Sequence, residues 1–113
     1  MKTALLILAL LPASAKPARV AEAGLALPNL HGHALTPLQA KGKQPAVLFF
    51  ITHDCPVANK MMPEMRRIAK DFSGKAQFTL VYIDPELDLK MLAKHQTDFT
   101  LAQINSVHDR KHQ

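Results

Sequence analysis

Two short, largely apolar runs stand out along this chain. The first covers residues 46–52 (AVLFFIT), and the second covers residues 76–83 (AQFTLVYI). Both contain β-branched and aromatic residues, and the first is bounded by Pro45 and Pro56. Because the apolar residues are consecutive rather than alternating, this pattern is typical of parallel strands that are covered on both faces. A buried helix is the competing interpretation, and the short length and the flanking prolines argue against it.

A helical spacing of apolar residues follows each run. Between residues 56 and 72, apolar residues recur at intervals of three or four, and Ser73-Gly74 ends the pattern. Pro63 lies inside this segment and is expected to bend the helix. After the second run, Asp84-Pro85-Glu86 resembles a helix start, so a second helix is predicted from there to about His95.

The order strand, helix, strand, helix predicts an α/β fold with parallel central strands. The chain divides into an irregular lead-in over residues 16–44, a core over residues 45–99 and a polar tail over residues 100–113. Within the lead-in, the proline, glycine and polar residues of 28–38 predict turns or a short hairpin. The tail has only a weak apolar stripe.

Residues 1–15 are predicted to be a secretory signal peptide rather than part of the domain. Lys2 supplies a positive start, residues 4–11 form an apolar stretch, and Ala13-Ser14-Ala15 has the small residues of a cleavage site. The apolar stretch is much shorter than the roughly 20 residues of a membrane span. The sequence therefore predicts export to the periplasm or the exterior, with an uncleaved N-terminal anchor as the alternative.

The charge pattern argues against two classes of partner. The chain has 14 Lys and Arg, 9 Asp and Glu, and a net charge of +5. The basic residues are dispersed among acidic ones, with almost no aromatic residues between them. A solvated surface is therefore expected, and neither a nucleic-acid patch nor a membrane patch.

Cys55 is the only cysteine, and it lies between the first predicted strand and the first predicted helix. At a helix N-terminus, unpaired N–H groups and the helix dipole favour an anion, and therefore the nucleophilic thiolate. In an oxidising compartment an odd cysteine is either free and reactive or paired with another molecule. An inert buried thiol is the alternative interpretation.

Several neighbours of Cys55 could take part in its chemistry. Thr52 could donate a hydrogen bond to the thiolate or to a bound peroxide oxygen. His53 and Asp54 flank the thiol and are expected to be surface residues, because adjacent side chains often point apart. A set of soft ligands around the thiol could hold Cu(I), although methionines at helical spacing more often fill a core. That set is Cys55, His53, Met61 and Met65.

The lead-in, the first strand, the cysteine motif and the proline of the first helix follow one another in a characteristic order. This order resembles the N-terminal part of the redoxin group of thioredoxin-like proteins, which includes AhpC/TSA-type peroxiredoxins and exported TlpA-like thiol proteins. Residues 28–43 are similar to their lead-in and residues 47–51 to their first central strand. The sequence Cys55-Pro-Val-Ala58 stands at the place of a Cys-x-x-Cys active site. Pro63 lies where these proteins bend the first helix, and Thr52 matches the peroxiredoxin Thr-x-x-Cys signature.

The resemblance covers residues 24–99, and the chain departs from it in three ways. Ala58 replaces the second cysteine, and Leu48 replaces the proline that opens the peroxiredoxin signature. Such proteins continue through a cis-proline segment, two more strands and a closing helix, for which the residues after Phe99 are too few. In peroxiredoxins an arginine of that part stabilises the thiolate, and Arg110 is a poor substitute. The resemblance thus implies a truncated thioredoxin-like fold.

The resemblance and the position of Cys55 together imply an exported thiol oxidoreductase with peroxidase-like, antioxidant chemistry. Cys55 is expected to attack a small peroxide with the help of Thr52, and an external thiol reductant or redox partner protein then restores it. No cofactor is expected. Two alternatives stay open: a non-catalytic binding module, as a Cu(I) carrier or a scaffold, and a truncated product without activity. A second copy of the chain could cover an open sheet edge and form a homodimer.

Overall fold

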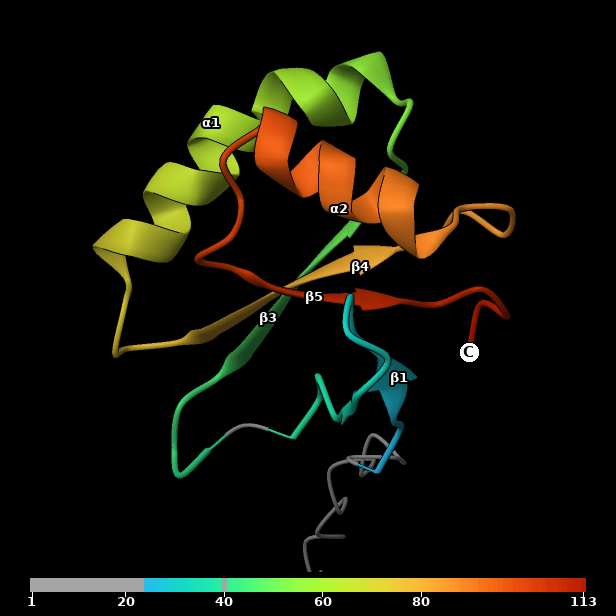
Figure 1. Cartoon of the computed structure of the whole chain (residues 1–113). Helices are drawn as coiled ribbons and strands as arrows, with labels where there is room; N and C mark the ends of the chain where they lie inside the picture. Colours follow the sequence, from blue (N-terminus) through green and yellow to red (C-terminus); the bar gives the residue numbers. More distant parts are fainter. Residues whose placement is uncertain (1–23, 40) are drawn as a thin grey trace, which may run out of the picture.

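A three-stranded parallel sheet forms the centre of the computed structural model, which describes residues 24–39 and 41–113 (Figure 1). The strands are β3 (Ala46–Ile51), β4 (Gln77–Tyr82) and β5 (Asn105–His108). β4 lies in the middle and pairs in parallel with both neighbours. The two strands predicted from the apolar runs are thereby confirmed. The predicted signal peptide lies outside the described residues.

Two helices cover one face of this sheet (Figure 1). They are α1 (Pro56–Asp71) and α2 (Leu89–Asp98). α1 contains Pro63, and Figure 1 shows the helix changing direction along its length. The arrangement confirms the α/β fold class. The main core lies between the helices and the sheet, and its buried residues are Ile51, Met62, Leu80, Tyr82, Leu87, Leu92, Leu101 and Ile104.

A smaller apolar cluster lies on the opposite face, where alternate strand residues point. Its buried members are Leu27, Val81 and Val107. Leu27 belongs to a two-stranded antiparallel hairpin of β1 (Leu27–Pro28) and β2 (Ala34–Leu35), which confirms the expected short hairpin. Next to β1, Asn29 forms an antiparallel bridge with Val107 and so joins the hairpin to β5.

The C-terminal segment differs from the expected polar tail, because residues 105–108 form β5. The weak apolar stripe is buried: Leu101 and Val107 are 0% exposed, and Ile104 is 3% exposed. Two polar residues of this segment, Ser106 and His108, are also buried, and each has a hydrogen-bond partner. Ser106 accepts a hydrogen bond from Gln96, and the His108 ring bonds to the Asp84 carbonyl at 2.6 Å. Tertiary hydrogen bonds therefore make a polar segment part of the sheet.

The predicted start of the second helix is also wrong. The helix begins at Leu89, and Asp88 is its N-cap, with its carboxylate accepting the Met91 N–H at 2.7 Å. Asp84 instead bonds to His53 across the neighbouring strand end. The two aspartates are equally good caps locally, and the tertiary contact decides between them.

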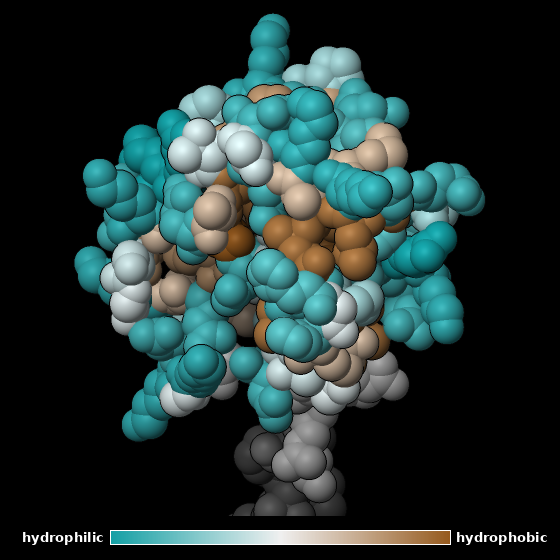
Figure 2. Space-filling model, in the orientation of Figure 1, coloured by the Kyte–Doolittle hydropathy of each residue, from teal (hydrophilic) through white to brown (hydrophobic). Residues whose placement is uncertain are grey.

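β3 forms one edge of the sheet, since among the described residues it pairs only with β4. Phe50 on this strand is 61% exposed. Pairing of a second copy at this edge stays a prediction. Hydrophilic side chains dominate the face seen in Figure 2, with an apolar area near its centre. Among the described helices, none is long and apolar enough to cross a membrane.

A test of β5 is the substitution Val107→Asp, which places a charge in a fully buried position. We expect it to lower the free energy of unfolding by about 3 kcal/mol or more, because the carboxylate would be buried against the apolar side chains of Leu27 and Val81. Ala102→Asp, at an exposed position, is the control and should change stability by about 0.5 kcal/mol at most. Chemical denaturation measures both. If both substitutions changed stability by the same small amount, residues 100–113 would be a solvated tail and not part of the sheet.

Candidate functional site

The sulfur of Cys55 lies at the N-terminus of α1. Cys55 is the N-cap residue, and its Sγ accepts a hydrogen bond from the Ala58 N–H at 3.5 Å. Its carbonyl accepts the first helical hydrogen bond, from the Asn59 N–H at 2.9 Å. The side chain is half-buried. A sulfur anion in this position is favoured by the N–H group that faces it and by the helix dipole.

Thr52 lies directly after β3, at the start of the turn that leads to Cys55. Its backbone carbonyl accepts the Cys55 N–H at 3.3 Å, which closes the turn. Thr52 is half-buried. This contact places the two residues side by side through the backbone, whereas a role for the Thr52 hydroxyl stays a prediction.

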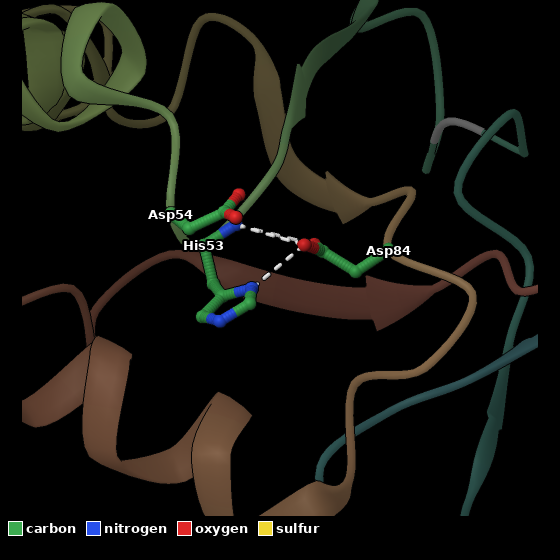
Figure 3. Close-up of side chains that lie close together, drawn as sticks. All are labelled: His53, Asp54 and Asp84. Carbon is green, nitrogen blue, oxygen red and sulfur yellow. Dashed lines mark hydrogen bonds and ion pairs between the residues drawn. The ribbon is translucent and has the colours of Figure 1, made fainter.

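The His53 ring forms a hydrogen bond with Asp84, a residue that sequence analysis did not assign to the site (Figure 3). His53 Nδ1 lies 2.7 Å from Asp84 Oδ1, and the His53 backbone N–H lies 3.2 Å from both carboxylate oxygens. The two side chains are 28% and 10% exposed, so His53 is not the surface residue that we expected. Asp84 directly follows the second apolar run, and parallel pairing brings the end of that run beside the Cys55 turn. The order of the strands could have indicated this contact.

A second set of hydrogen bonds joins α1, α2 and β4 below the turn. The Asn59 amide donates to the His53 carbonyl at 3.1 Å, and its oxygen lies 2.9 Å from His95 Nε2. The Tyr82 hydroxyl lies 2.8 Å from His95 Nδ1. One assignment satisfies all these contacts: Nε2 of a neutral His95 donates to Asn59, and Nδ1 accepts from Tyr82.

The buried environment keeps both members of this contact neutral. Burial lowers the pKa of His95, the nearby His53 lowers it further, and Asp84 and Asp98 act in the opposite direction. Burial raises the pKa of the Tyr82 hydroxyl, and the Asp84 carboxylate adds to that effect. A neutral imidazole that accepts from a neutral phenol is therefore the stable arrangement at neutral pH.

A pocket of about 310 Å³ lies over this set of hydrogen bonds, between α1 and α2. It combines two imidazoles with an ion pair at its rim, in which Lys94 Nζ lies 2.5 Å from Asp98 Oδ2. Among the lining residues, Met91 and Phe99 supply apolar surface. The pocket is therefore wide enough for a small polar molecule beside His53.

The methionines of α1 occupy different environments. Met65 packs against the main core, and the intervening Met62 is fully buried. Met61 is 46% exposed. Core filling thus accounts for Met65, and a Cu(I) set of Met61, Met65, His53 and Cys55 stays a prediction.

Comparison with known protein families matches residues 20–113 to the family described as AhpC/TSA family. The structure resembles a secreted Mycobacterium tuberculosis disulfide oxidoreductase homologous to E. coli DsbE, with a TM-score of 0.64 and 21% identity over 75% of this chain and 60% of that chain. It also resembles M. tuberculosis DsbF, with a TM-score of 0.62 and 20% identity over 74% of this chain and 59% of that chain.

A further resemblance is to a thiol-disulfide oxidoreductase from Bacteroides fragilis, with a TM-score of 0.57 and 21% identity over 77% of this chain and 64% of that chain. The chain therefore spans less than two thirds of the length of these three proteins. A search of curated proteins finds no match. These likenesses show a thioredoxin-like fold.

The lowered pKa of His95 predicts a loss of stability in acid. The folded state holds this imidazole neutral, so the unfolded chain binds more protons than the folded chain when the pH is below about 6.5. The free energy of unfolding therefore decreases as the pH is lowered through this range. His95→Gln should be less stable at pH 7.5 but show a weaker loss between pH 7.5 and pH 5. Denaturant titrations across this range measure the effect, with the exposed His31→Gln as the control. Parallel curves for the parent and His95→Gln would contradict this assignment.

Proposed function

Since the chain belongs to the AhpC/TSA family, we propose that it is a single-cysteine thiol oxidoreductase in which Cys55 is the nucleophile. The observation that carries the proposal is the position of its sulfur as the N-cap of α1, facing the Ala58 N–H. This position favours the thiolate, which is the reactive form of cysteine. Since Cys55 is half-buried, a small molecule can reach it.

The proposed first step is attack of the Cys55 thiolate on a peroxide oxygen. The sulfur–oxygen bond forms as the oxygen–oxygen bond breaks, so that the peroxide is reduced to an alcohol or water and Cys55 becomes a sulfenic acid. The leaving oxygen takes a proton from solvent. The Ala58 N–H and the Thr52 hydroxyl are the groups proposed to stabilise the negative charge.

The proposed second stage requires an external thiol, because the chain has no other cysteine. A thiol condenses with the sulfenic acid and releases water, which leaves a mixed disulfide at Cys55. A second external thiol attacks that disulfide, restores the Cys55 thiol and leaves as the oxidised disulfide. The partner is therefore a thiol reductant or a redox protein that presents such a thiol.

The contact between His53 and Asp84 supports this chemistry by fixing the turn. The buried Asp84 carboxylate accepts the His53 N–H, so the backbone two residues before Cys55 is attached to the end of β4. Asn59 holds the His53 carbonyl from the helix side. A turn held from both sides keeps the thiol at the helix terminus without a second cysteine.

Export is the second part of the proposal, and residues 1–15 support it by their charge and apolar pattern. In an oxidising compartment a lone cysteine is either free and reactive or paired with another molecule.

We expect the purified parent protein to form a sulfenic acid at Cys55 when it is treated with one equivalent of hydrogen peroxide, detectable by dimedone labelling and mass spectrometry. Thr52→Val keeps the shape of the side chain and removes the hydroxyl, and we expect it to slow labelling by about tenfold or more. Cys55→Ser should give no labelling.

The denatured parent protein and an exposed substitution on the same helix, Val57→Ala, are the controls. Val57→Ala should react at the parent rate, and the denatured protein should react more slowly than the folded one. Equal rates for folded and denatured protein would mean that the fold does not activate the thiol, and a scaffold function would replace the proposed one.

Expression of the full chain in a bacterium with an intact secretion system tests export. We expect the product in the periplasmic or extracellular fraction, with Lys16 as its first residue in N-terminal sequencing. Replacing Ala13 and Ala15 by bulky residues should retain the uncleaved chain. A product that keeps Met1 and stays with the cytoplasmic fraction would contradict the proposal.

A further inference from the structure

Two carboxylates and one imidazole meet at the turn between β3 and α1, without a basic partner of fixed charge. The residues are His53, Asp54 and Asp84. Figure 3 shows that His53 and Asp54 follow one strand and that Asp84 follows the neighbouring strand. Among the described lysines and arginines, none forms an ion pair with Asp54 or Asp84. His53 alone cannot balance two carboxylates, so this turn carries a local excess of negative charge in a basic chain.

The ligand atoms of the three residues are close enough to surround one ion. One nitrogen or oxygen atom from each residue lies within 4.8 Å of the other two. Ligands of a tetrahedral Zn²⁺ ion, at about 2.1 Å from the metal, lie about 3.4 Å from one another. His53 Nδ1 and Asp84 Oδ1 are already 2.7 Å apart. Binding requires rotation of the exposed Asp54 side chain and a separation of His53 Nδ1 from Asp84 Oδ1 by about 0.7 Å.

We propose that His53 Nδ1, one Asp54 oxygen and Asp84 Oδ1 bind a divalent transition-metal ion such as Zn²⁺. Imidazole nitrogen combined with carboxylate oxygen suits Zn²⁺ better than Mg²⁺ or Ca²⁺, which favour oxygen alone. Three protein ligands leave at least one coordination position for water or a small anion. The ion would replace the hydrogen between His53 and Asp84, and that proton would move to Nε2 of the neutral imidazole.

The hydrogen bonds around the turn leave the site in place when the ion binds. Asp84 Oδ2 lies 3.2 Å from the His53 backbone N–H, so one oxygen can hold the turn while Oδ1 binds the metal. The Asn59 amide holds the His53 carbonyl at 3.1 Å. Such contacts orient a ligand before the metal arrives and raise affinity. Cys55 does not belong to this set, so the site is separate from the thiol.

Isothermal titration of the full chain with Zn²⁺ at pH 7.5 tests the proposal. Cys55→Ser is the reference protein, because it removes the thiol as a competing ligand. We expect one ion per chain, and Asp54→Asn should weaken binding at least tenfold. Asp54 is exposed, so this variant should fold, and circular dichroism checks that it does. Zn²⁺ should raise the melting temperature of the reference protein and not that of the Asp54→Asn variant.

Two controls separate this site from adventitious binding. Replacing His31 and His33 together by Gln removes a pair of exposed imidazoles, and affinity should be unchanged. Asp71→Asn removes an exposed carboxylate at the other end of α1 and should also have no effect. Co²⁺ bound to the chain with Cys55 intact should show no thiolate charge-transfer band. Absence of stoichiometric binding, equal affinity in Asp54→Asn, or loss of binding in the His31 and His33 variant would each overturn the proposal.

Failure of this site and failure of the proposed thiol function are distinguishable. Asp54→Asn removes a proposed metal ligand and leaves Cys55 in place, whereas Cys55→Ser removes the thiol and leaves the three ligands. Zn²⁺ binding that survives Cys55→Ser supports the metal site whatever the outcome of the peroxide experiment.

Discussion

The parallel pairing of β3 with β4 is the constraint on which the rest of this structure depends. Ile51 pairs with Tyr82, and the Ile83 N–H continues the ladder to the Ile51 carbonyl at 3.0 Å. Because parallel strands end at the same edge, the residues that follow each strand meet there. This edge therefore brings the buried Asp84 carboxylate to His53, two residues before Cys55.

The polar groups behind that edge are satisfied, which makes the turn a rigid support for the thiol. The described part of the chain contains no buried side-chain nitrogen or oxygen without a partner. Tyr82, His95 and Asn59 connect β4, α2 and α1 through their side chains, and Asn59 reaches the His53 backbone. Such a network is stable only when every member has a partner, so it also specifies the protonation state of His95.

The residue pattern within a segment was sufficient to predict its strand or helix wherever the apolar residues had a clear spacing. Both apolar strands, the N-terminal hairpin and the first helix were predicted close to their observed bounds, because burial on both faces and helical spacing leave clear traces. β5 carried too few apolar residues to be predicted, since Ser106 and His108 are buried through hydrogen bonds instead. The position of Cys55 at the helix terminus was predicted correctly, whereas the contact of His53 with Asp84 was missed.

The sequence by itself determined the fold class and the lone thiol at a strand-to-helix junction. Those features depend on residues that are near one another in the chain, and local physical chemistry specifies them. Only the tertiary structure decided whether Asp84 or Asp88 caps α2, because the alternative use of Asp84 involves a residue 31 positions away. The same holds for β5, whose polar residues become buried only when α2 and the end of β4 supply their hydrogen-bond partners.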